Sequence, residues 1–473
     1  MSLANTHYGV EGLEALLRER RHLFFVGIGG VHMAALALIA RARGLAVRGS
    51  DAHEGERVRT LRRLGIEVEI GHNGARVGKN DILIYTLAIS EDNPEYLAAK
   101  ALGIPVVSRA DLLAYLTAHN TRRIGIAGSH GKSTVTAMLN TIFTAAGRDP
   151  TVLCGAALPG TDTPVRIGEG KDCVFEACEY GNSFLAFHPT VAVILNVDFD
   201  HADFFRDMDA LTSSFCAFAA LPGEGGTVIF CAEDERAARA AAHSPARKYS
   251  FGLSHGDCYA KDLHYEGGRG RFSLCLLEHV CGEITLRVPG EHNVKNALAA
   301  ALTAAVAGIP VPVILQALSH FEGAARRLEP RGVLRGAQVI DDYAHHPEEI
   351  RASIRAVRQF TPKTGRVFAV FQPHTYSRTA ALFDGFCEAL AEADRVFVAD
   401  IYPARETDTL GMSAEGLAAG IGVNAAFVGG FAEIAAALAG EVCDKDTVLV
   451  MGAGDIDGIF AKFSPKDFTL YKK

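Results

Sequence analysis

The chain has 473 residues, 49% of them hydrophobic, with a formal net charge of −8 and ten cysteines. A chain of this length is too long to fold around one hydrophobic core, so we expect two to four domains. The negative charge, with no basic run interleaved with aromatics, excludes a general nucleic-acid surface, and the sequence shows neither a signal-peptide core nor an apolar run that could span a bilayer. The cysteines form no CxxC pair and have no zinc-like spacing, which favours a reducing cytoplasm, no disulfide bonds and no membrane association.

Short apolar segments alternate with Ala- and Leu-rich helical segments along most of the chain, which predicts an α/β fold with largely parallel sheets. The first unit, residues 1–119, begins with a predicted strand at 22–26, a glycine turn and a helix that ends near Gly44. Further strands are expected at 46–48 and within "NDILIYTLAI" and "GIPVVS". Open parallel sheets bind ligands outside the carboxyl ends of their strands, so these ends are candidate sites.

The glycine turn of the first unit, "GIGGVHM", nearly matches the dinucleotide-binding pattern G-x-G-x-x-G. Gly27 and Gly29 are in place, but His32 occupies the position of the third glycine. An acidic residue, Asp51, follows about twenty positions further on, where the pattern places one. The turn predicts a phosphate-bearing ligand without specifying NAD, and the alternative is a tight turn that binds nothing.

The second unit, residues 120–323, opens with the phosphate-loop sequence "GIAGSHGKSTVTAML". Ile126 stands where the strict pattern requires its first glycine, but Gly131, Lys132 and Ser133 complete the pattern. An apolar strand precedes the loop and apolar residues at helical spacing follow it, which is the context the motif requires. We expect the loop amides and the helix N-terminus to bind phosphate, Lys132 to neutralise the outer phosphates and Ser133 to ligate Mg²⁺. The alternative is an ordinary glycine turn with an exposed lysine.

Polar residues also follow two later strands of this unit. Glu176 lies just past the end of the predicted strand in "CVFEACEYG", and Asp200 and His201 follow the strand in "NVDFDHADFF". A carboxylate at such a position can bind a nucleotide-held Mg²⁺, whereas histidine is an unusual magnesium ligand; a surface acid and a satisfied histidine are the alternatives. Residues 248–290 show short alternating runs that predict antiparallel strands at the side of this unit, and a boundary is expected near Gly323.

The third unit, residues 324–473, has predicted strands within "AQVIDDY", "RVFAVFQPH", "DRVFVADIY" and "DTVLVMGAG". Titratable groups cluster after these strands in "DDYAHHPEEI" and "FQPHTYSR", and the pair Arg326–Arg327 precedes them. A single cluster of charges is usually a solvated face, but several clusters at strand ends of one domain favour a cleft.

Taken together, eleven ordered motifs resemble the Mur ligase family, the ATP-dependent amide-forming enzymes of peptidoglycan synthesis. The resemblance covers nearly the whole chain and rests on "FVGIGG", "GSD", "GSHGKST", "FEACEY", "NVDFDHADFF", "GEHNVKNALAA", "RRLE", "DDYAHHPEE", "QPHTYSR", "DIYPARE" and "GAGDID". It implies three domains, each with a largely parallel Rossmann-like sheet: a UDP-sugar domain (1–119), a central P-loop ATP domain with a small antiparallel addition (120–323) and an amino-acid domain (324–473). It further implies that L-alanine is joined to the carboxylate of UDP-N-acetylmuramate through an acyl phosphate, with ATP and Mg²⁺, by a monomer or weak homodimer.

The resemblance also assigns roles to individual residues. The triphosphate would be bound by the loop residues Gly128, Ser129, His130, Gly131, Lys132, Ser133 and Thr134. Mg²⁺ would be held by Ser133, Glu176 and His201, the adenine side of ATP by His292, Asn293 and Asn296, the phosphates by Arg327 and the ribose by Asp342. UDP would contact Gly29, Gly30 and Asp51, and the amino acid and acyl group would contact Tyr343, His345, His346, His374 and Arg378. The catalytic set is then Lys132, Glu176, His201, Arg327 and His345, with His345 as the hypothetical general base.

Several residues depart from the family pattern. Cys178 stands where the family generally has Asp, and Gly181 often replaces another Asp; His32 and Ala34 occupy positions that are usually small and hydroxylic, and Leu328 replaces a common Phe. Other hypotheses stay open. The "GIGG" turn and Asp51 allow an NAD-dependent oxidoreductase, and Cys178 and His32 allow a nucleotide-binding homologue with weakened catalysis. Within the ligases, the alternative is a related enzyme that adds a tripeptide or another amino acid to the same sugar. The motifs "QPHTYSR" and "DIYPARE" favour a single amino acid.

Overall fold

The computed structural model describes residues 3–201, 204–404 and 406–471. The chain forms two compact units, each assembled from separate stretches of sequence. Unit 1 comprises Met1–Asp198, Asp209–Phe251 and Ala299–Val313, and unit 2 comprises Phe199–Met208, Gly252–Leu298 and Ile314–Lys473. No helix in the described ranges is both long enough and apolar enough to cross a membrane.

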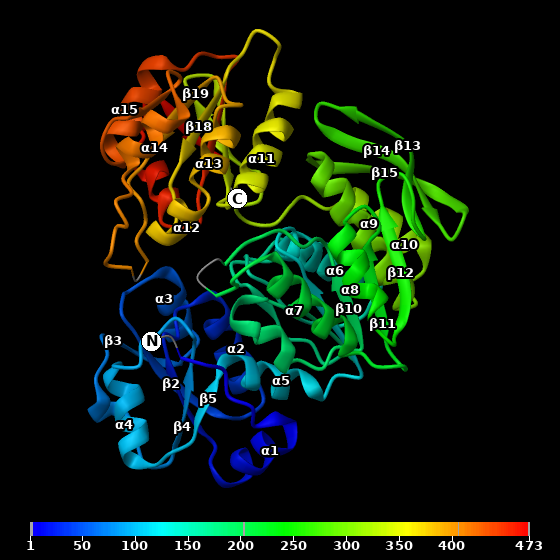
Figure 1. Ribbon diagram of the computed structural model, residues 1–473, viewed down its shortest axis with the longest axis vertical. Helices are drawn as coiled ribbons and strands as arrows, with labels where there is room; N and C mark the ends of the chain where they lie inside the picture. Colours follow the sequence, from blue (N-terminus) through cyan, green and yellow to red (C-terminus); the bar gives the residue numbers. More distant parts are fainter. Residues whose placement is uncertain (1–2, 202–203, 405, 472–473) are drawn as a thin grey trace. The chain divides into compact units, whose positions relative to one another are not determined.

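The first sheet of unit 1 has five parallel strands in the order β3-β2-β1-β4-β5 (Figure 1). Its strands are β1 (His22–Val26), β2 (Ala46–Asp51), β3 (Glu67–Ile70), β4 (Asp81–Tyr85) and β5 (Val106–Ser108). Its helices are α1 (Gly9–Glu19), α2 (Val31–Ala42), α3 (Glu56–Arg63), α4 (Pro94–Leu102) and α5 (Arg109–Ala118), with a 3-10 turn η1 (Gly74–Arg76). The predicted strand at 22–26 coincides with β1, whereas β2 runs three residues beyond the predicted 46–48 and so carries Asp51 at its carboxyl end.

Local sequence signals explain where some of these helices begin and end. The side chain of Asn93 accepts hydrogen bonds from the amides of Glu95 and Tyr96, and Pro94 occupies the first turn of α4, where its missing N–H costs nothing. The same helix ends at Gly103 in the left-handed conformation, with φ of +64°. Ser108 caps α5 in the same manner by accepting from the amide of Asp111.

The strands of the second sheet that lie in unit 1 have the order β12-β11-β10-β6-β9-β7-β8. Its strands are β6 (Arg122–Ala127), β7 (Thr151–Leu153), β8 (Val165–Arg166), β9 (Asp172–Glu176), β10 (Val191–Ile194), β11 (Thr227–Cys231) and β12 (Arg247–Gly252). All are parallel except β8, which pairs antiparallel with β7. The accompanying helices are α6 (Lys132–Ala145), η2 (Tyr180–Ala186), α7 (Met208–Ala220), α8 (Glu235–Ala242) and the end of α9 (Glu291–Val306).

The antiparallel strands expected over residues 248–290 begin later than predicted. Strand β12 pairs parallel with β11, so the prediction was wrong for residues 248–252. The antiparallel set lies in unit 2 and consists of β13 (Cys258–Glu266), β14 (Arg269–Leu276) and β15 (His279–Pro289). Period-two alternation predicts a strand but does not identify its partner, and β12 continues the parallel sheet because it follows the helix α8.

The third sheet lies in unit 2 and has the order β20-β19-β18-β21-β17-β16-β22, with β16 and β22 antiparallel at one edge. Its strands β18 and β19 are labelled in Figure 1. Its strands are β16 (Glu329–Leu334), β17 (Ala337–Asp342), β18 (Val367–Phe371), β19 (Arg395–Val398), β20 (Ala425–Phe427), β21 (Thr447–Met451) and β22 (Phe468–Leu470). The helices of this region are α10 (Val311–Ser319), α11 (Pro347–Phe360), α12 (Tyr376–Ala381), α13 (Phe383–Leu390), α14 (Ala414–Ile421), α15 (Phe431–Glu441) and η3 (Ile456–Ala461).

Both faces of this sheet are buried, because successive residues of its central strands point to opposite sides. On strand β21, Leu449 and Met451 pack with α11, α13 and α14, whereas Val448 and Val450 pack with α15 and η3. The central strands β18 and β21 are therefore apolar at every position except Thr447, as expected for parallel strands covered on both faces.

Candidate active site

The phosphate loop of unit 1 joins β6 to α6, as its sequence predicts. Gly128 has φ of +145°, and a Cβ added there would lie 2.9 Å from the Cβ of Leu195, so a side chain does not fit. Gly131 precedes α6 in the left-handed conformation, with φ of +86°. Ser133 and Thr134 are buried in the first turn of α6. The positive end of a 14-residue helix therefore faces the loop.

The loop is fixed by the segment that follows β10. Asn196 accepts a hydrogen bond from the amide of His130 at 2.8 Å, and its own amide group donates to the carbonyl of His130 at 3.1 Å. The hydroxyl of Ser129 donates to the carbonyl of Asp198 at 2.8 Å and accepts from the amide of Asp198 at 2.9 Å. The anchoring residues lie in the quoted motif "NVDFDHADFF", but their roles were not foreseen, because partners distant in sequence become visible only in the fold.

Lys132 is paired with a buried carboxylate that sequence analysis did not single out. Its ammonium lies 3.2 and 3.3 Å from the two carboxylate oxygens of Glu179, and it also donates to the carbonyls of Gly128 and Ser129. The side chain of Glu179 is 1% exposed. Burial lowers the pKa of Lys132, but Glu179 and the other acidic neighbours outweigh this effect and raise the pKa, so Lys132 remains a cation.

Ser133 and Glu176 lie on either side of a small space that Gly155 leaves open. A Cβ added to Gly155 would lie 2.9 and 3.1 Å from the carboxylate oxygens of Glu176 and 3.1 Å from the hydroxyl of Ser133. The amide of Gly155 also donates to Glu176, which fixes the carboxylate. One hydroxyl and one carboxylate fit a Mg²⁺ ion that takes its remaining ligands from phosphate and water. Accordingly, the described residues contain no cluster of three or more His, Cys, Asp or Glu side chains that could hold a metal by themselves.

The glycine turn of the first sheet is fixed by Asp51. The amide of Gly29 donates to the Asp51 carboxylate at 2.8 Å, and a Cβ on Gly29 would lie 2.8 Å from the same oxygen. Gly30 is the N-cap of α2, and its amide donates to the carbonyl of Gly27 at 3.1 Å. Next to Asp51, the buried Glu95 accepts hydrogen bonds from Ser50 at 2.8 Å and from the amide of Asn73 at 3.2 Å. The three residues predicted to contact UDP therefore lie together at the carboxyl ends of β1 and β2.

Unit 2 gathers the predicted acyl and amino-acid residues around Asp200. The guanidinium of Arg378 donates twice to one oxygen of this buried carboxylate, at 3.0 and 3.2 Å. The amide of His201 donates to the same oxygen at 2.7 Å, and the ring nitrogen Nε2 of His346 lies 3.1 Å from the carbonyl of Phe199. Burial raises the pKa of Asp200, but His201, Arg378 and the nearby imidazoles more than reverse this, so the pKa lies well below its usual range.

His345 lies in the same cluster. Its ring centroid is 5.4 Å from that of Tyr343 and 6.4 Å from that of His374, which stacks on Tyr402 at 5.5 Å. Its Nδ1 lies 3.0 Å from the carbonyl of Tyr343, which places the ring proton on Nδ1 and leaves Nε2 as the basic atom. Burial lowers the pKa of His345 to about 3, with Arg378 acting in the same direction. The imidazole is therefore neutral at pH 7 but is a weaker base than a free histidine.

A second group in unit 2 contains the residues predicted to hold the nucleoside side of ATP. The guanidinium of Arg327 lies 5.1 Å from the ring centroid of Tyr343. Asp342 accepts hydrogen bonds from the amides of Leu328 and Ala344, each at 2.7 Å; burial nevertheless raises its pKa to about 6, with Arg327 acting in the opposite direction.

The asparagines and the histidine of this group lie in the first turns of α9. The side-chain amide of Asn293 donates to the carbonyl of Pro289 at 2.7 Å, and Asn296 donates to Asn293 at 3.2 Å. Burial lowers the pKa of His292 to about 4, and Arg327 is among its charged neighbours.

The predicted residues are thus divided between the two units. Lys132, Ser133 and Glu176 converge in unit 1, whereas His201 belongs to unit 2, where it lies beside Asp200.

The structure shows the surroundings of two residues that depart from the family pattern, Gly181 and Cys178. Gly181 has φ of +62°, and a Cβ there would lie 2.4 Å from Leu87; Cys178 has Glu179, Lys132 and Arg109 as charged neighbours, and burial raises its pKa. All ten cysteines are free, as expected.

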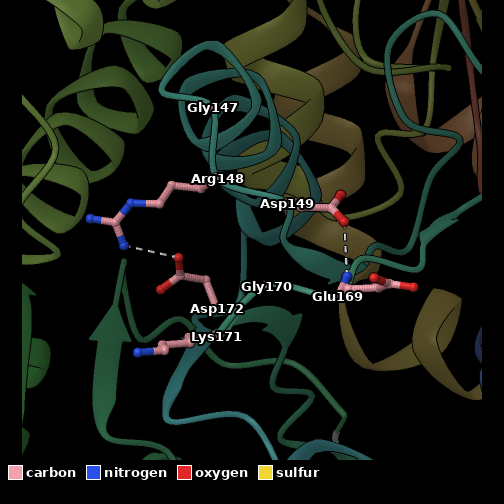
Figure 2. Close-up of a pocket in the computed structure, with 7 residues that line it drawn as sticks. All are labelled: Gly147, Arg148, Asp149, Glu169, Gly170, Lys171 and Asp172. Carbon is pink, nitrogen blue, oxygen red and sulfur yellow. Dashed lines mark hydrogen bonds and ion pairs between the residues drawn. The ribbon is translucent and has the colours of Figure 1, made fainter.

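A pocket of about 400 Å³ lies at the opposite edge of the second sheet, at the amino ends of β7 and β9 (Figure 2). Its charged groups are largely satisfied within the chain: Arg148 pairs with Asp172 at 3.1 Å, and Asp149 accepts from the amide of Glu169 at 2.9 Å. None of the predicted site residues lines it. We therefore do not associate this pocket with the candidate active site.

The fold and the loop define a P-loop ligase architecture, and comparisons with known proteins agree. The chain matches three family models: Mur ligase family, catalytic domain (residues 22–121), Mur ligase middle domain (126–304) and Mur ligase, glutamate ligase domain (326–454). The chain belongs to the Mur ligase family.

Individual relatives indicate which members of the Mur ligase family the chain is similar to. The chain is 40% identical over 439 residues to UDP-N-acetylmuramate–L-alanine ligase from Clostridium novyi, covering 92% of this chain and 95% of that protein. It is 38% identical over 456 residues to the ligase of the same name from Caldanaerobacter subterraneus, covering 95% and 99%. Among solved structures, UDP-N-acetylmuramate–alanine ligase from Thermotoga maritima is similar with a TM-score of 0.80 and 28% identity, over 93% of this chain and 98% of that chain.

Proposed function

We propose that the chain joins L-alanine to the carboxylate of UDP-N-acetylmuramate, with conversion of ATP to ADP and phosphate. The observation that carries this proposal is the 38–40% identity to ligases of that name over 92–95% of the chain. The phosphate loop and its paired lysine support the use of ATP. A Mur ligase from Thermotoga maritima that shares 18% identity with the chain was solved in complex with ADP.

We propose three functional domains: residues 1–119 for the UDP-sugar, 120–323 for ATP and 324–473 for the amino acid. The three separate family models, which end or begin near these boundaries, support this division. We also propose that the protein acts in the cytoplasm as a monomer or weak homodimer, which sedimentation velocity across a concentration series tests. A stable dimer or higher oligomer at micromolar concentration would contradict this part of the proposal.

The chemistry requires activation of the carboxylate, because its negative charge repels an incoming amine. A carboxylate oxygen attacks the γ-phosphorus of ATP, the bond to the β-γ bridging oxygen breaks, and an acyl phosphate and ADP form. The amine of L-alanine then attacks the acyl carbon, and the phosphate leaves with the oxygen that came from the carboxylate. Transfer of this kind depends on positioning and charge stabilisation more than on covalent help from the protein.

In unit 1, the loop amides and the N-terminus of α6 would hold the triphosphate, and Lys132 would exchange part of its contact with Glu179 for the outer phosphates. Ser133 and Glu176 would hold Mg²⁺, and we propose His201 as a further ligand. When bound, Mg²⁺ supplies positive charge at the phosphate oxygens. Gly155 keeps this space free, because any larger residue would place a carbon against both donors.

In unit 2, Arg327 would contact the phosphates, Asp342 the ribose, and His292, Asn293 and Asn296 the adenine side. Arg378, held by Asp200, would orient the amino acid together with Tyr343, His346 and His374. His345 remains our proposed base, since its Nε2 carries the lone pair and the imidazole is neutral at pH 7. Its lowered pKa means that it accepts a proton effectively only when a neighbouring negative charge, such as that of bound substrate, raises its basicity.

The proposal is tested by phosphate release from ATP with UDP-N-acetylmuramate and a panel of L-amino acids, including glycine, serine and alanine. We expect release that requires both the UDP-sugar and alanine. A second candidate is addition of the tripeptide L-alanyl-γ-D-glutamyl-meso-diaminopimelate, because a ligase of that description from Neisseria meningitidis is 26% identical with a TM-score of 0.59. Faster release with the tripeptide than with alanine would favour that candidate, and release without any acceptor would contradict both.

A further inference from the structure

Within the described residues of unit 1, the Nε2 atom of His32 and the half-buried guanidinium of Arg109, both outside the phosphate loop, have no hydrogen-bond or ion-pair partner. The Nε2 atom of His32 is buried and has no hydrogen-bond partner among the described residues. The guanidinium of Arg109 makes no hydrogen bond or ion pair anywhere in the described part of the chain. A buried donor or charge without a partner is costly, so such groups point to a ligand that supplies the missing contact.

The fold places these two residues together. His32 lies in the first turn of α2, after β1, and Arg109 is the first residue of α5, after β5. Helices α2 and α5 pack against each other. Among the charged residues that influence the pKa of His32, Arg109 has the largest effect, followed by Glu176 and Lys132 of the second sheet. Helix α5 also packs against η2, which begins directly after Glu179, the partner of Lys132. The pair therefore lies in the same part of unit 1 as the groups that would bind the reactive end of ATP.

The charge balance around the pair favours an anion. Lys132 is paired with Glu179 at 3.2 Å, whereas no carboxylate within the described residues pairs with Arg109. The titratable neighbour that acts on Arg109 is Cys178. The family resemblance implies an aspartate at this position, so the cysteine of this chain removes a carboxylate that could have paired with Arg109. His32 is neutral at pH 7, because burial lowers its pKa to about 4, and it can act as an N–H donor.

We propose that Arg109 and His32 bind the carboxylate of UDP-N-acetylmuramate and hold it beside Lys132. This inference rests on the proposed function and specifies how the acid is oriented toward the phosphoryl group. A planar guanidinium with two free N–H edges matches a carboxylate, and a neighbouring imidazole N–H adds a third donor. The diphosphate of the same ligand is the other candidate anion, but our proposal assigns it to the turn at Gly29 and Gly30.

The test is calorimetric binding of two ligands without ATP: UDP-N-acetylmuramate and UDP-N-acetylglucosamine, which has the same nucleotide and sugar without the lactyl carboxylate. Arg109→Ala is expected to weaken UDP-N-acetylmuramate binding by about ten- to one-hundred-fold and to change UDP-N-acetylglucosamine binding less than about twofold. His32→Ala is expected to weaken only the former by about three- to ten-fold, and His32→Ser to recover part of this loss. Equal losses for both ligands, or no loss for either, would overturn the inference.

Controls separate a specific effect from misfolding. Arg18→Ala removes an exposed arginine of α1 that pairs with Glu14 on the surface, and it should bind both ligands as the wild type does. Each variant should also bind ATP with unchanged affinity; if Arg109→Ala fails this control, the Arg109→Lys and His32→Ala variants carry the test. A wild-type protein that does not bind UDP-N-acetylmuramate would refute the proposed function itself, whereas wild-type binding that the variants retain would refute only this inference.

Discussion

In the phosphate loop of unit 1 a cation, Lys132, is held by one buried carboxylate, whereas in unit 2 one buried carboxylate, Asp200, is shared by several cationic or imidazole groups. Glu179 lies 3.2 Å from Lys132, and Arg378 lies 3.0 Å from Asp200. The loop charges are thus balanced one to one before any ligand binds. The Asp200 cluster has one full negative charge facing Arg378 and the imidazoles of His201, His345 and His346.

This difference indicates how each region responds to an anionic ligand. In unit 1 a triphosphate must compete with Glu179 for Lys132. Binding of the triphosphate therefore depends on the geometry of the loop amides as well as on the charge of Lys132. In unit 2 an added carboxylate meets a guanidinium that is already paired with Asp200, beside the neutral imidazole of His345. The following substitutions test this comparison, beginning with the largest expected effect.

Replacement of Lys132 by Met should have the largest effect, because it removes the lysine cation of the loop and takes that cation away from Glu179. We expect kcat to fall by about a thousandfold, which corresponds to roughly 4 kcal/mol of transition-state stabilisation. Steady-state phosphate release measures this effect. Lys171→Met, which removes a lysine at the opposite edge of the sheet, is the matched control. Activity of Lys132→Met within tenfold of the wild type would contradict the assignment.

Asp200→Asn should be the next most damaging change, because it leaves the buried guanidinium of Arg378 without its counter-charge. Breaking a buried ion pair from one side costs about 3 kcal/mol. Urea unfolding followed by fluorescence should show a lower midpoint for this variant. The exposed Asp209 serves as control, since its side chain is 87% exposed and Asp209→Asn should leave the midpoint unchanged. Equal midpoints for Asp200→Asn and the wild type would show that the cluster does not depend on this carboxylate.

Gly155→Ala should have a smaller effect, specific to the metal. The added methyl group would lie 2.9 Å from a carboxylate oxygen of Glu176 and displace one of the two proposed donors. We expect the Mg²⁺ concentration for half-maximal rate to rise by about tenfold, or roughly 1.4 kcal/mol. Gly225→Ala is the control, because open space surrounds Gly225. An unchanged Mg²⁺ requirement would remove Ser133 and Glu176 from the proposed metal site.

Asp341 provides the smallest and most selective test, because its pKa moves in the opposite direction to that of Asp200. Burial raises the pKa of Asp341 to about 7, although Arg326 and Arg331 act against this. Between pH about 4 and about 7 the folded chain therefore holds a proton that the unfolded chain has released, so stability falls as pH rises through this window and is level above it.

Asn at position 341 cannot ionise, so this part of the pH dependence disappears in Asp341→Asn. The Tm of the variant minus that of the wild type should increase by about 3 °C from pH 5 to pH 8. Thermal unfolding at several pH values measures this difference. If the difference stayed constant with pH, Asp341 would not carry the raised pKa.

Local sequence signals were sufficient to predict most of the fold. Strand β1 and the loop between β6 and α6 followed from apolar runs, glycine positions and helical spacing, because these features act over a few residues. The parallel pairing of β12 was missed, because alternation within a strand does not identify its neighbour. The wider family resemblance correctly predicted three largely parallel sheets and the family itself.

The site was predicted less completely, for a physical reason. Residues such as Lys132 and Ser133 are recognisable because the motif fixes their chemistry. The residues that contact them, Glu179 and Gly155, lie at distant positions in the sequence and come close only in the folded chain. Motif spacing alone therefore does not reveal them. Likewise, His32 stood out only as a departure from a glycine pattern, and its relation to Arg109 depends on the packing of α2 against α5.

The central claim is that an oxygen of the UDP-N-acetylmuramate carboxylate is phosphorylated by ATP before the amide forms. UDP-N-acetylmuramate labelled with ¹⁸O in that carboxylate, together with ATP and L-alanine, tests this claim directly by mass spectrometry of the released phosphate. The account predicts one ¹⁸O atom in each phosphate released from doubly labelled substrate. Amide formation with phosphate that carries no ¹⁸O would contradict it.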